Sequence, residues 1–219
     1  MTGQPLAATR GVAVNLTLLC AILLHNLTYP LSVAGGIWPA VFYCFYAVIF
    51  VAATWALTGD VWLRGFVAVS GLAVLMAGLN NSYLPSQSAA LAVFLTSIVY
   101  HLAMVVVLAL YTFRARTVMA DVVLSATSLY LVIGSGFAAI FALIEWVAPG
   151  SFIVSSGAII NWQQMVYYSY ITLTTLGYGD ITPVGFYAQA VASLEAVIGV
   201  LYTVILLSRL VGLYASGRR

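Results

Sequence analysis

Six long apolar runs constrain this chain more than any other feature of its sequence. They are separated by short polar stretches and extend over residues 11–30, 37–57, 61–79, 87–113, 121–147 and 186–214. A helix of about 20 apolar residues is long enough to cross the hydrocarbon core of a bilayer. Because a helix satisfies its backbone hydrogen bonds within one segment, the six runs predict an all-α integral membrane protein with six transmembrane helices.

The scarcity of charge supports a membrane protein. Charged residues make up 5% of the chain and hydrophobic residues 64%, whereas soluble domains are about 25% charged. A net charge of +2 is too small to indicate a nucleic-acid partner. We also expect no enzyme and no bound cofactor, because His25 and His101 stand apart and the five carboxylates are scattered.

The arginines fall on one side of the predicted six-helix topology. They are Arg10, Arg64, Arg114, Arg116, Arg209, Arg218 and Arg219, and the loops on the opposite side hold no basic residue. By the positive-inside rule, both termini are predicted to be cytoplasmic. We expect a multi-pass protein of the plasma membrane, and the short loops favour a prokaryotic cell. A cleavable signal peptide is the alternative for the first run, whose length favours a retained helix.

The segment TLTTLGYGDITP, residues 172–183, lies between the last two apolar runs. It resembles the selectivity filter of potassium channels, in which Val is commonest at the position of Leu176. Residues 162–173 resemble the pore helix that precedes the filter, and Ile181-Thr182-Pro183 resembles the turn that follows it. The resemblance implies a re-entrant pore helix and filter loop, in a four-fold symmetric homotetramer because one filter copy cannot close a ring. A Gly-Tyr-Gly turn in some other membrane protein is the alternative.

The resemblance also implies where K⁺ binds. Channels replace the hydration shell of the ion with backbone carbonyls, which here belong to Thr175, Leu176, Gly177 and Tyr178, with the Thr175 hydroxyl innermost. The carbonyls can share one axis only if ordinary and left-handed dihedrals alternate, and Gly177 and Gly179 supply residues that tolerate the second kind. The side chains of Leu176 and Tyr178 are expected to brace the filter from outside.

Two aromatic residues of the predicted pore helix are expected to brace the filter. Tyr167 lies thirteen residues before Asp180, at a position where many family members have Trp, and the resemblance implies that it hydrogen-bonds Asp180. Tyr168 is expected to brace Tyr178. Alternatively, both are aromatic residues of the membrane interface.

Two carboxylates at membrane depth need partners, because an ionised group there is expensive. Glu145 resembles a residue that, in six-helix channels, bonds the backbone at the top of the sixth helix. Glu195 lies in the segment LEAVIG and is expected to face the filter or the pore helix. Structural bracing is the predicted role of both.

The last run contains the predicted gate and cavity. Gly199 lies twenty residues after Gly179 and matches the hinge glycine of the family. It either lets the helix bend or lets a neighbouring helix approach closely, and the sequence favours neither. Val200, Thr203 and Leu207 lie at helical spacing and are expected to line the cavity and inner mouth.

The chain divides into a four-helix unit, residues 1–117, and a pore domain, residues 118–219. The first unit has the layout of a voltage sensor without its gating charges, since His101 is the only residue of the fourth run that can carry a positive charge. Steep voltage dependence is therefore not expected. The connection after Arg114 is short, so each four-helix unit is predicted to pack on the pore of its own subunit.

These observations predict a potassium-selective channel that conducts K⁺ passively, with membrane lipid, K⁺ and three further copies of the chain as partners. A weakly selective monovalent cation channel is the alternative. A potassium transporter subunit is a further one, although such transporters carry four degenerate filter repeats in one chain, whereas this chain has a single intact copy.

Overall fold

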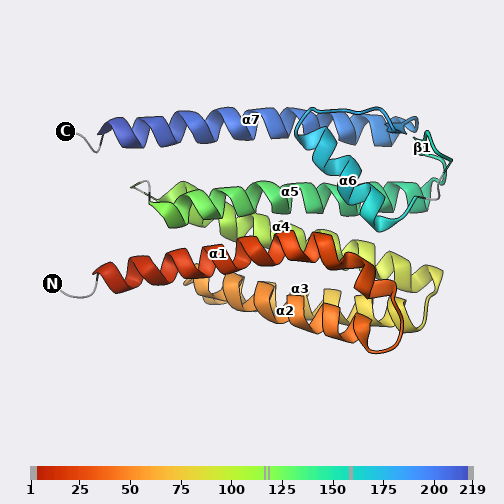
Figure 1. Ribbon diagram of the computed structural model, residues 1–219, viewed down its shortest axis with the longest axis horizontal. Helices are drawn as coiled ribbons and strands as arrows, with labels where there is room; N and C mark the ends of the chain where they lie inside the picture. The colour runs from red at the N-terminus through yellow and green to blue at the C-terminus, as the bar shows by residue number, and fades with distance from the viewer. Residues whose placement is uncertain (1–3, 116, 118, 158–159, 217–219) are drawn as a thin grey trace.

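A computed structural model describes residues 4–115, 117, 119–157 and 160–216, which form a bundle of long helices lying side by side (Figure 1). The elements, in chain order, are α1 (Gln4–Thr28), the 3₁₀ helix η1 (Tyr29–Val33), α2 (Trp38–Leu57), α3 (Val61–Tyr83), α4 (Gln87–Arg114), α5 (Ala120–Val147), β1 (Phe152–Val154), α6 (Trp162–Leu173), β2 (Ile181–Pro183) and α7 (Phe186–Ser216). All of these except η1, α6 and the two strands are long and apolar helices that can cross a membrane, which makes six candidate spans in the described residues.

The third helix is longer than its apolar run. Residues 80–83, predicted to belong to a loop, form the last turn of α3, and the N–H of Leu84 donates to the carbonyl oxygen of Asn80 at 2.8 Å. Asn and Ser in this stretch weaken a helix without breaking it. The helix ends before Pro85 because a proline disfavours helical dihedrals in the residue that precedes it.

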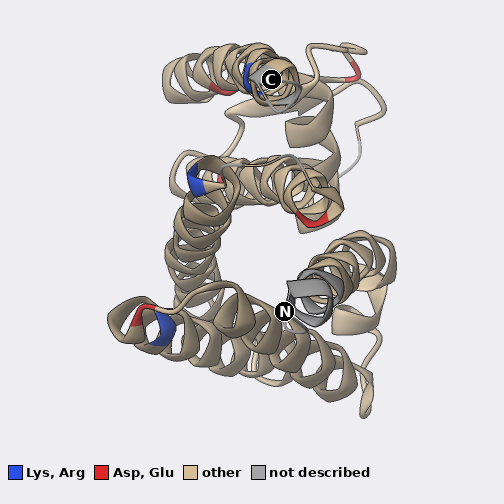
Figure 2. Ribbon diagram, turned by 90° about the vertical axis from the view of Figure 1, so that its left-hand side faces the viewer, with Lys and Arg blue, Asp and Glu red and all other residues tan. Residues whose placement is uncertain are grey.

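The first residues of α1 and the last of α7 lie at the same end of the bundle (Figure 1). Figure 2 looks onto this end and colours the ribbon blue at the arginines of the described residues. There the Nη atoms of Arg209 donate to the carbonyl oxygens of Thr112 and Ala115, at 3.0 and 2.6 Å, and so tie α7 to the end of α4. A cation at the C-terminal end of a helix is favourable because the last carbonyls lack partners there.

Helix α5 is the shared wall of two cores. On one side it packs against α1 and α4, in a core that contains Leu18, Val67, Met104 and Leu129. On the other it packs against α6 and α7, in a core built around Phe141. The four-helix unit thus packs on α5 of its own chain. The predicted boundary between the four-helix unit and the pore domain lies between residues 117 and 118. Residues 116 and 118 are outside the described residues.

Two short strands modify the all-helical prediction. β1 and β2 pair antiparallel, with Ile153 opposite Thr182. Ile181-Thr182-Pro183 is therefore a strand, where the resemblance implied a turn. β-branched residues favour extended backbone, but the partner strand lies far away in the sequence and no periodicity reveals it. The pairing brings together the two ends of the segment that contains α6 and the following loop.

Candidate functional site

Helix α6 lies between α5 and α7 at the end of the bundle opposite to the chain termini (Figure 1). It begins with a capping box: Asn161 Oδ1 accepts from the N–H of Gln164, and Gln164 Oε1 accepts from the N–H of Asn161, both at 3.0 Å. Such a pair satisfies two donors that a helix start leaves free. The helix covers the residues predicted for it.

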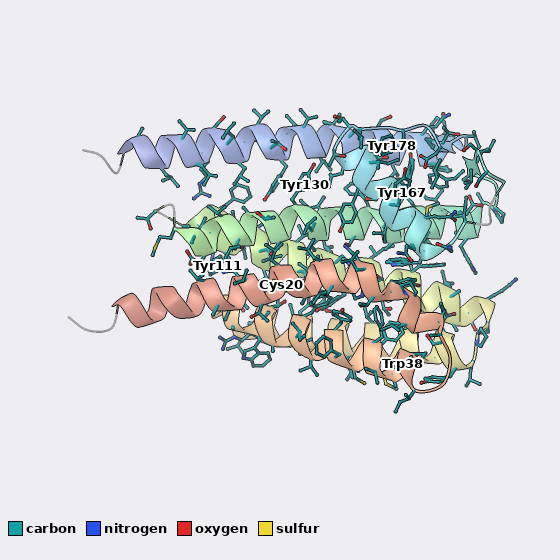
Figure 3. The ribbon with its side chains drawn as sticks, viewed as in Figure 1. Cys20, Trp38, Tyr111, Tyr130, Tyr167 and Tyr178 are labelled. Carbon is teal, nitrogen blue, oxygen red and sulfur yellow. The ribbon has the colours of Figure 1, made fainter. Side chains whose placement is uncertain are left out.

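The C-terminal end of α6 is held by both neighbouring helices. Tyr130 of α5, which Figure 3 shows between α5 and α7, donates from its hydroxyl to the carbonyl oxygen of Leu173 at 3.1 Å. From α7, Gly199 approaches the same carbonyl so closely that an added Cβ would lie 1.9 Å from its oxygen. α7 is helical on both sides of Gly199. Close packing therefore requires the glycine, and its role as a hinge stays a prediction.

The loop after α6 has an alternating backbone. φ is positive at Thr175 (58°), Gly177 (54°) and Gly179 (77°), and at no other position between residues 174 and 180. The N–H groups of Leu176 and Gly177 both donate to the carbonyl oxygen of Ile171, at 2.8 and 3.2 Å. These two N–H groups of the loop therefore bind the C-terminal end of α6.

This geometry leaves the loop carbonyls free. Within the described part of the chain, no hydrogen bond is accepted by the backbone oxygens of residues 175–178. Positive φ at Thr175 was not predicted, because a side chain makes this conformation costly by about 1–2 kcal/mol. A row of unpaired carbonyls and a strained residue are typical of a segment that binds a ligand.

Several residues of the candidate site are exposed in this single chain. The side chains of Leu176 and Tyr178 are 55% and 67% exposed. The predicted cavity residues Val200, Thr203 and Leu207 are also exposed on one side of α7, and the Thr203 hydroxyl donates to the carbonyl of Gly199 at 3.0 Å. An apolar face of this extent is consistent with further protein or lipid around α7.

Tyr167 and Asp180 fasten the loop to α6. The Tyr167 hydroxyl donates to Asp180 Oδ2 at 2.7 Å, as the resemblance implied. Asp180 Oδ1 accepts from the N–H of Ile181 at 3.1 Å, and its backbone oxygen accepts from the N–H of Ser155 at 2.8 Å. The hydrogen bond to Asp180 raises the pKa of Tyr167 to about 12. The loop, α6 and the segment after β1 meet at this pair.

Tyr168 has other partners than the resemblance implied. Its ring centroid lies 5.0 Å from that of Phe141 and 5.2 Å from that of Phe152. Successive residues of a helix point about 100° apart, so Tyr168 points into the core while Tyr167 reaches Asp180. Tyr168 therefore braces α6 against α5 and β1 of its own chain, in place of Tyr178.

Glu145 also differs from its expected contact. Its carboxylate accepts from the N–H of Gly150 at 2.8 Å and from that of Phe152 at 3.1 Å, and so holds the turn after α5 rather than the start of α7. Glu145 lies in the last turn of α5. The nearest free N–H donors belong to the residues that follow the helix, Gly150 and Phe152. The start of α7 is held instead by Ser151, whose backbone oxygen accepts from the N–H of Gly185 at 3.0 Å.

Glu195 faces α6, as predicted, and its partner is Ser169. Glu195 is 0% exposed, and its Oε1 contacts the Ser169 hydroxyl. The same hydroxyl donates to the carbonyl oxygen of Gly134 at 2.7 Å. The single hydroxyl proton of Ser169 therefore lies between two acceptors, the carbonyl oxygen of Gly134 and Oε1 of Glu195.

No sequence pattern indicates the role of Tyr170, which connects α6 to α1 and α5. Its hydroxyl accepts from Asn26 Nδ2 at 2.8 Å, lies 3.0 Å from Ser135 Oγ and donates to the carbonyl oxygen of Leu131 at 3.1 Å. An added Cβ at Gly134 would lie 2.5 Å from the Tyr170 ring. These contacts join segments far apart in the sequence, so only the packing of the helices reveals them.

Comparison with known proteins supports an ion channel. Residues 141–215 match the family model described as "Ion channel". This region contains the end of α5, α6, the loop and most of α7, whereas the first four helices lie outside it. No curated protein and no solved structure matches the chain. Together with the six apolar helices, the match supports a multi-pass membrane protein that works as an ion channel.

Proposed function

We propose that four copies of this chain form a potassium-selective channel that conducts K⁺ passively. The observation that carries the proposal is the positive φ at every second residue of the loop, at Thr175, Gly177 and Gly179. Alternation of this kind turns successive carbonyls toward one axis, where oxygens can replace the hydration shell of an ion. The carbonyls of Thr175, Leu176, Gly177 and Tyr178 are the proposed K⁺ ligands.

The surrounding structure suits a cation. The C-terminal end of a helix carries a partial negative charge, and α6 ends next to the loop. Gly199 is the proposed gating hinge, and Val200, Thr203 and Leu207 are proposed to face the cavity below the filter, where four α7 helices meet. Neighbouring subunits would cover the exposed side chains of Leu176 and Tyr178.

The proposed channel lies in the plasma membrane with both termini in the cytoplasm. Residues 1–117 form its peripheral unit and residues 118–219 its pore domain. Three arginines support this orientation, because they lie near the ends of helices that are close to the chain termini. They are Arg64 of α3, Arg114 of α4 and Arg209 of α7. Lipid contacts the apolar outer faces of the helices, and no cofactor is required.

The reversal potential of the purified protein in planar bilayers, with K⁺ on one side and Na⁺ on the other, tests the selectivity. We expect reversal near the potassium equilibrium potential. Gly177→Ala and Gly179→Ala place a Cβ where φ is 54° and 77° and are expected to lose selectivity or conduction. Leu176→Val restores the commonest residue of the family and is the control that keeps both.

The other outcomes identify other functions. Reversal near zero would indicate a weakly selective cation channel. Flux that does not vanish at the potassium equilibrium potential would indicate a transporter. Native mass measurement of the solubilised protein tests the stoichiometry, and any mass other than that of four copies would contradict the proposed ring.

A further inference from the structure

A cavity of about 90 Å³ lies where the four-helix unit meets α5 and α6. Most of its lining residues belong to α1–α4. Its walls include aromatic rings from four elements, namely those of Tyr29, Tyr46, Tyr100 and Trp162. One buried water needs about 10–15 Å³ of such space. The cavity therefore has room for several waters or for one small organic molecule.

The walls exclude an ion as the occupant. Among the described residues, no Asp, Glu, Lys or Arg side chain lines the cavity, and its walls are mostly apolar. A buried charge without a partner of opposite charge is strongly unfavourable. Polar groups of the wall such as Asn26 and Ser97 can hold single waters, but the aromatic rings between them offer a row of waters few partners. A neutral molecule with an apolar body fits better.

His101 determines which polar group such a molecule should carry. Its Nδ1 lies 2.7 Å from the backbone oxygen of Ser97, which only accepts hydrogen bonds, so Nδ1 carries the ring proton of the neutral imidazole. Nε2 is then an acceptor. It has no hydrogen-bond partner among the described residues, and His101 is one of the residues that line the cavity. The free position in the cavity wall thus requires a donor.

We propose that this cavity binds a small neutral molecule with an apolar, preferably aromatic, body and one O–H donor, as in a phenol, and that its occupancy acts on the pore helix. The hydroxyl donates to His101 Nε2, and the ring stacks among the aromatic side chains of the wall.

The contact with the pore helix runs through two residues of the wall. Asn26 and Ser135 line the cavity, and both contact the hydroxyl of Tyr170 in α6, at 2.8 and 3.0 Å. Trp162, the first residue of α6, also lines it. A molecule that moves these groups changes the hydrogen bonds that position α6, and hence the filter. This second part rests on the proposed channel function, whereas the binding itself does not.

Binding is tested with 4-fluorophenol and the detergent-solubilised full chain, by ¹⁹F NMR titration. We expect saturable binding that phenol displaces. Val74 lines the cavity, and Val74→Phe is expected to abolish binding by filling it. Val69 lies on the same helix with 69% of its surface exposed, so Val69→Phe is the matched control and is expected to bind normally.

The hydrogen bond has its own test. His101→Phe removes the acceptor and is expected to bind 4-fluorophenol about tenfold more weakly. 4-Fluorotoluene, which lacks the donor, should bind the original chain and this variant equally. Absence of saturable binding, or equal binding by the Val74→Phe and Val69→Phe variants, would overturn the site. An unchanged affinity in His101→Phe would overturn the assigned donor.

The coupling is tested by recording current with and without phenol, relative to the basal current of each variant. We expect phenol to change the current of the original chain and of Val69→Phe, but not of Val74→Phe. Tyr170→Phe is expected to bind 4-fluorophenol while losing the current response. Binding without any current response in the original chain would overturn the coupling, and absence of potassium current without phenol would instead contradict the channel function.

Discussion

The hydroxyl of Tyr167 donates to Asp180 Oδ2 at 2.7 Å and joins the middle of α6 to the end of the loop that follows it. The two residues are thirteen positions apart, and between them the backbone passes through all three positive φ angles of the loop. Because both ends of the loop are fixed to α6, its backbone can stay in a costly conformation without an ion.

Tyr167→Phe should therefore lower the ion selectivity of the filter more than it lowers the stability of the protein. Loss of this hydrogen bond should lower the free energy of unfolding only slightly, because water can replace the lost partner of an exposed group. The ratio of K⁺ to Na⁺ permeability, from reversal potentials, should fall. Tyr187→Phe is the control, because Tyr187 is 73% exposed at the start of α7. Equal selectivity in both variants would contradict the role of this hydrogen bond.

The contact between Tyr167 and Asp180 also predicts that the stability of the fold falls at high pH, when Tyr167 loses its proton. The hydrogen bond to Asp180, with smaller contributions from burial and from the charge of Asp180, raises the pKa of Tyr167 to about 12. An acid whose pKa is raised in the folded state stabilises that state fully below its ordinary pKa, which is about 10 for Tyr, and the effect is lost as the pH rises through the folded pKa. The difference in phenolate absorbance between the original chain and Tyr167→Phe should show one group titrating above pH 10. Titration of this group at or below pH 10 would contradict the contact.

Gly199→Ala should be strongly destabilising. Its Cβ would lie 1.9 Å from the backbone oxygen of Leu173, and neither helix can move this atom away without shifting its backbone. Overpacking of this kind costs about 1–3 kcal/mol. Gly212→Ala is the matched control on α7, where an added Cβ meets nothing within 4 Å. Thermal unfolding of both variants measures the difference, and a stable Gly199→Ala variant with altered opening would favour the hinge instead.

Glu195→Gln should be tolerated, whereas Glu195→Ala should not. The side-chain oxygen of Gln can accept from the Ser169 hydroxyl in place of Glu195 Oε1, and the buried space stays filled. Alanine leaves a void beside Ser169 and removes one partner of its hydroxyl, at a cost of about 1–3 kcal/mol. Thermal unfolding and permeability ratios should separate the variants. If the two are equally damaged, Glu195 acts as a charged carboxylate.

Conductance should depend only weakly on voltage. Moving one charge through the membrane potential supplies about 2.3 kcal/mol per 100 mV, and α4 contains no Lys or Arg before Arg114. Current recorded over the physiological voltage range, with equal K⁺ on both sides, should follow the applied voltage nearly linearly. A steep sigmoidal conductance would reveal a charge that moves elsewhere in the chain.

Much of this structure could be predicted from local sequence. The six spans follow from apolar runs, because a bilayer accepts only helices that satisfy their own backbone. The bounds of α6 were predicted from the resemblance of residues 162–173 to a pore helix, and the capping box of Asn161 and Gln164 explains its start. Gly177 and Gly179 mark the positive φ angles because glycine adopts them without a steric cost.

Tertiary packing decided which partner each side chain has. The sequence predicts that Tyr168 and Glu145 brace the structure. Which groups they contact depends on how α5, α6 and β1 are rotated and spaced. The close approach of Gly199 to Leu173 appears only in the packing of α6 against α7. The cavity next to His101 is built from separate helices, each of which appears in the sequence as an ordinary apolar run. The sequence determines which segments enter the membrane, and contacts between distant segments determine what those segments enclose.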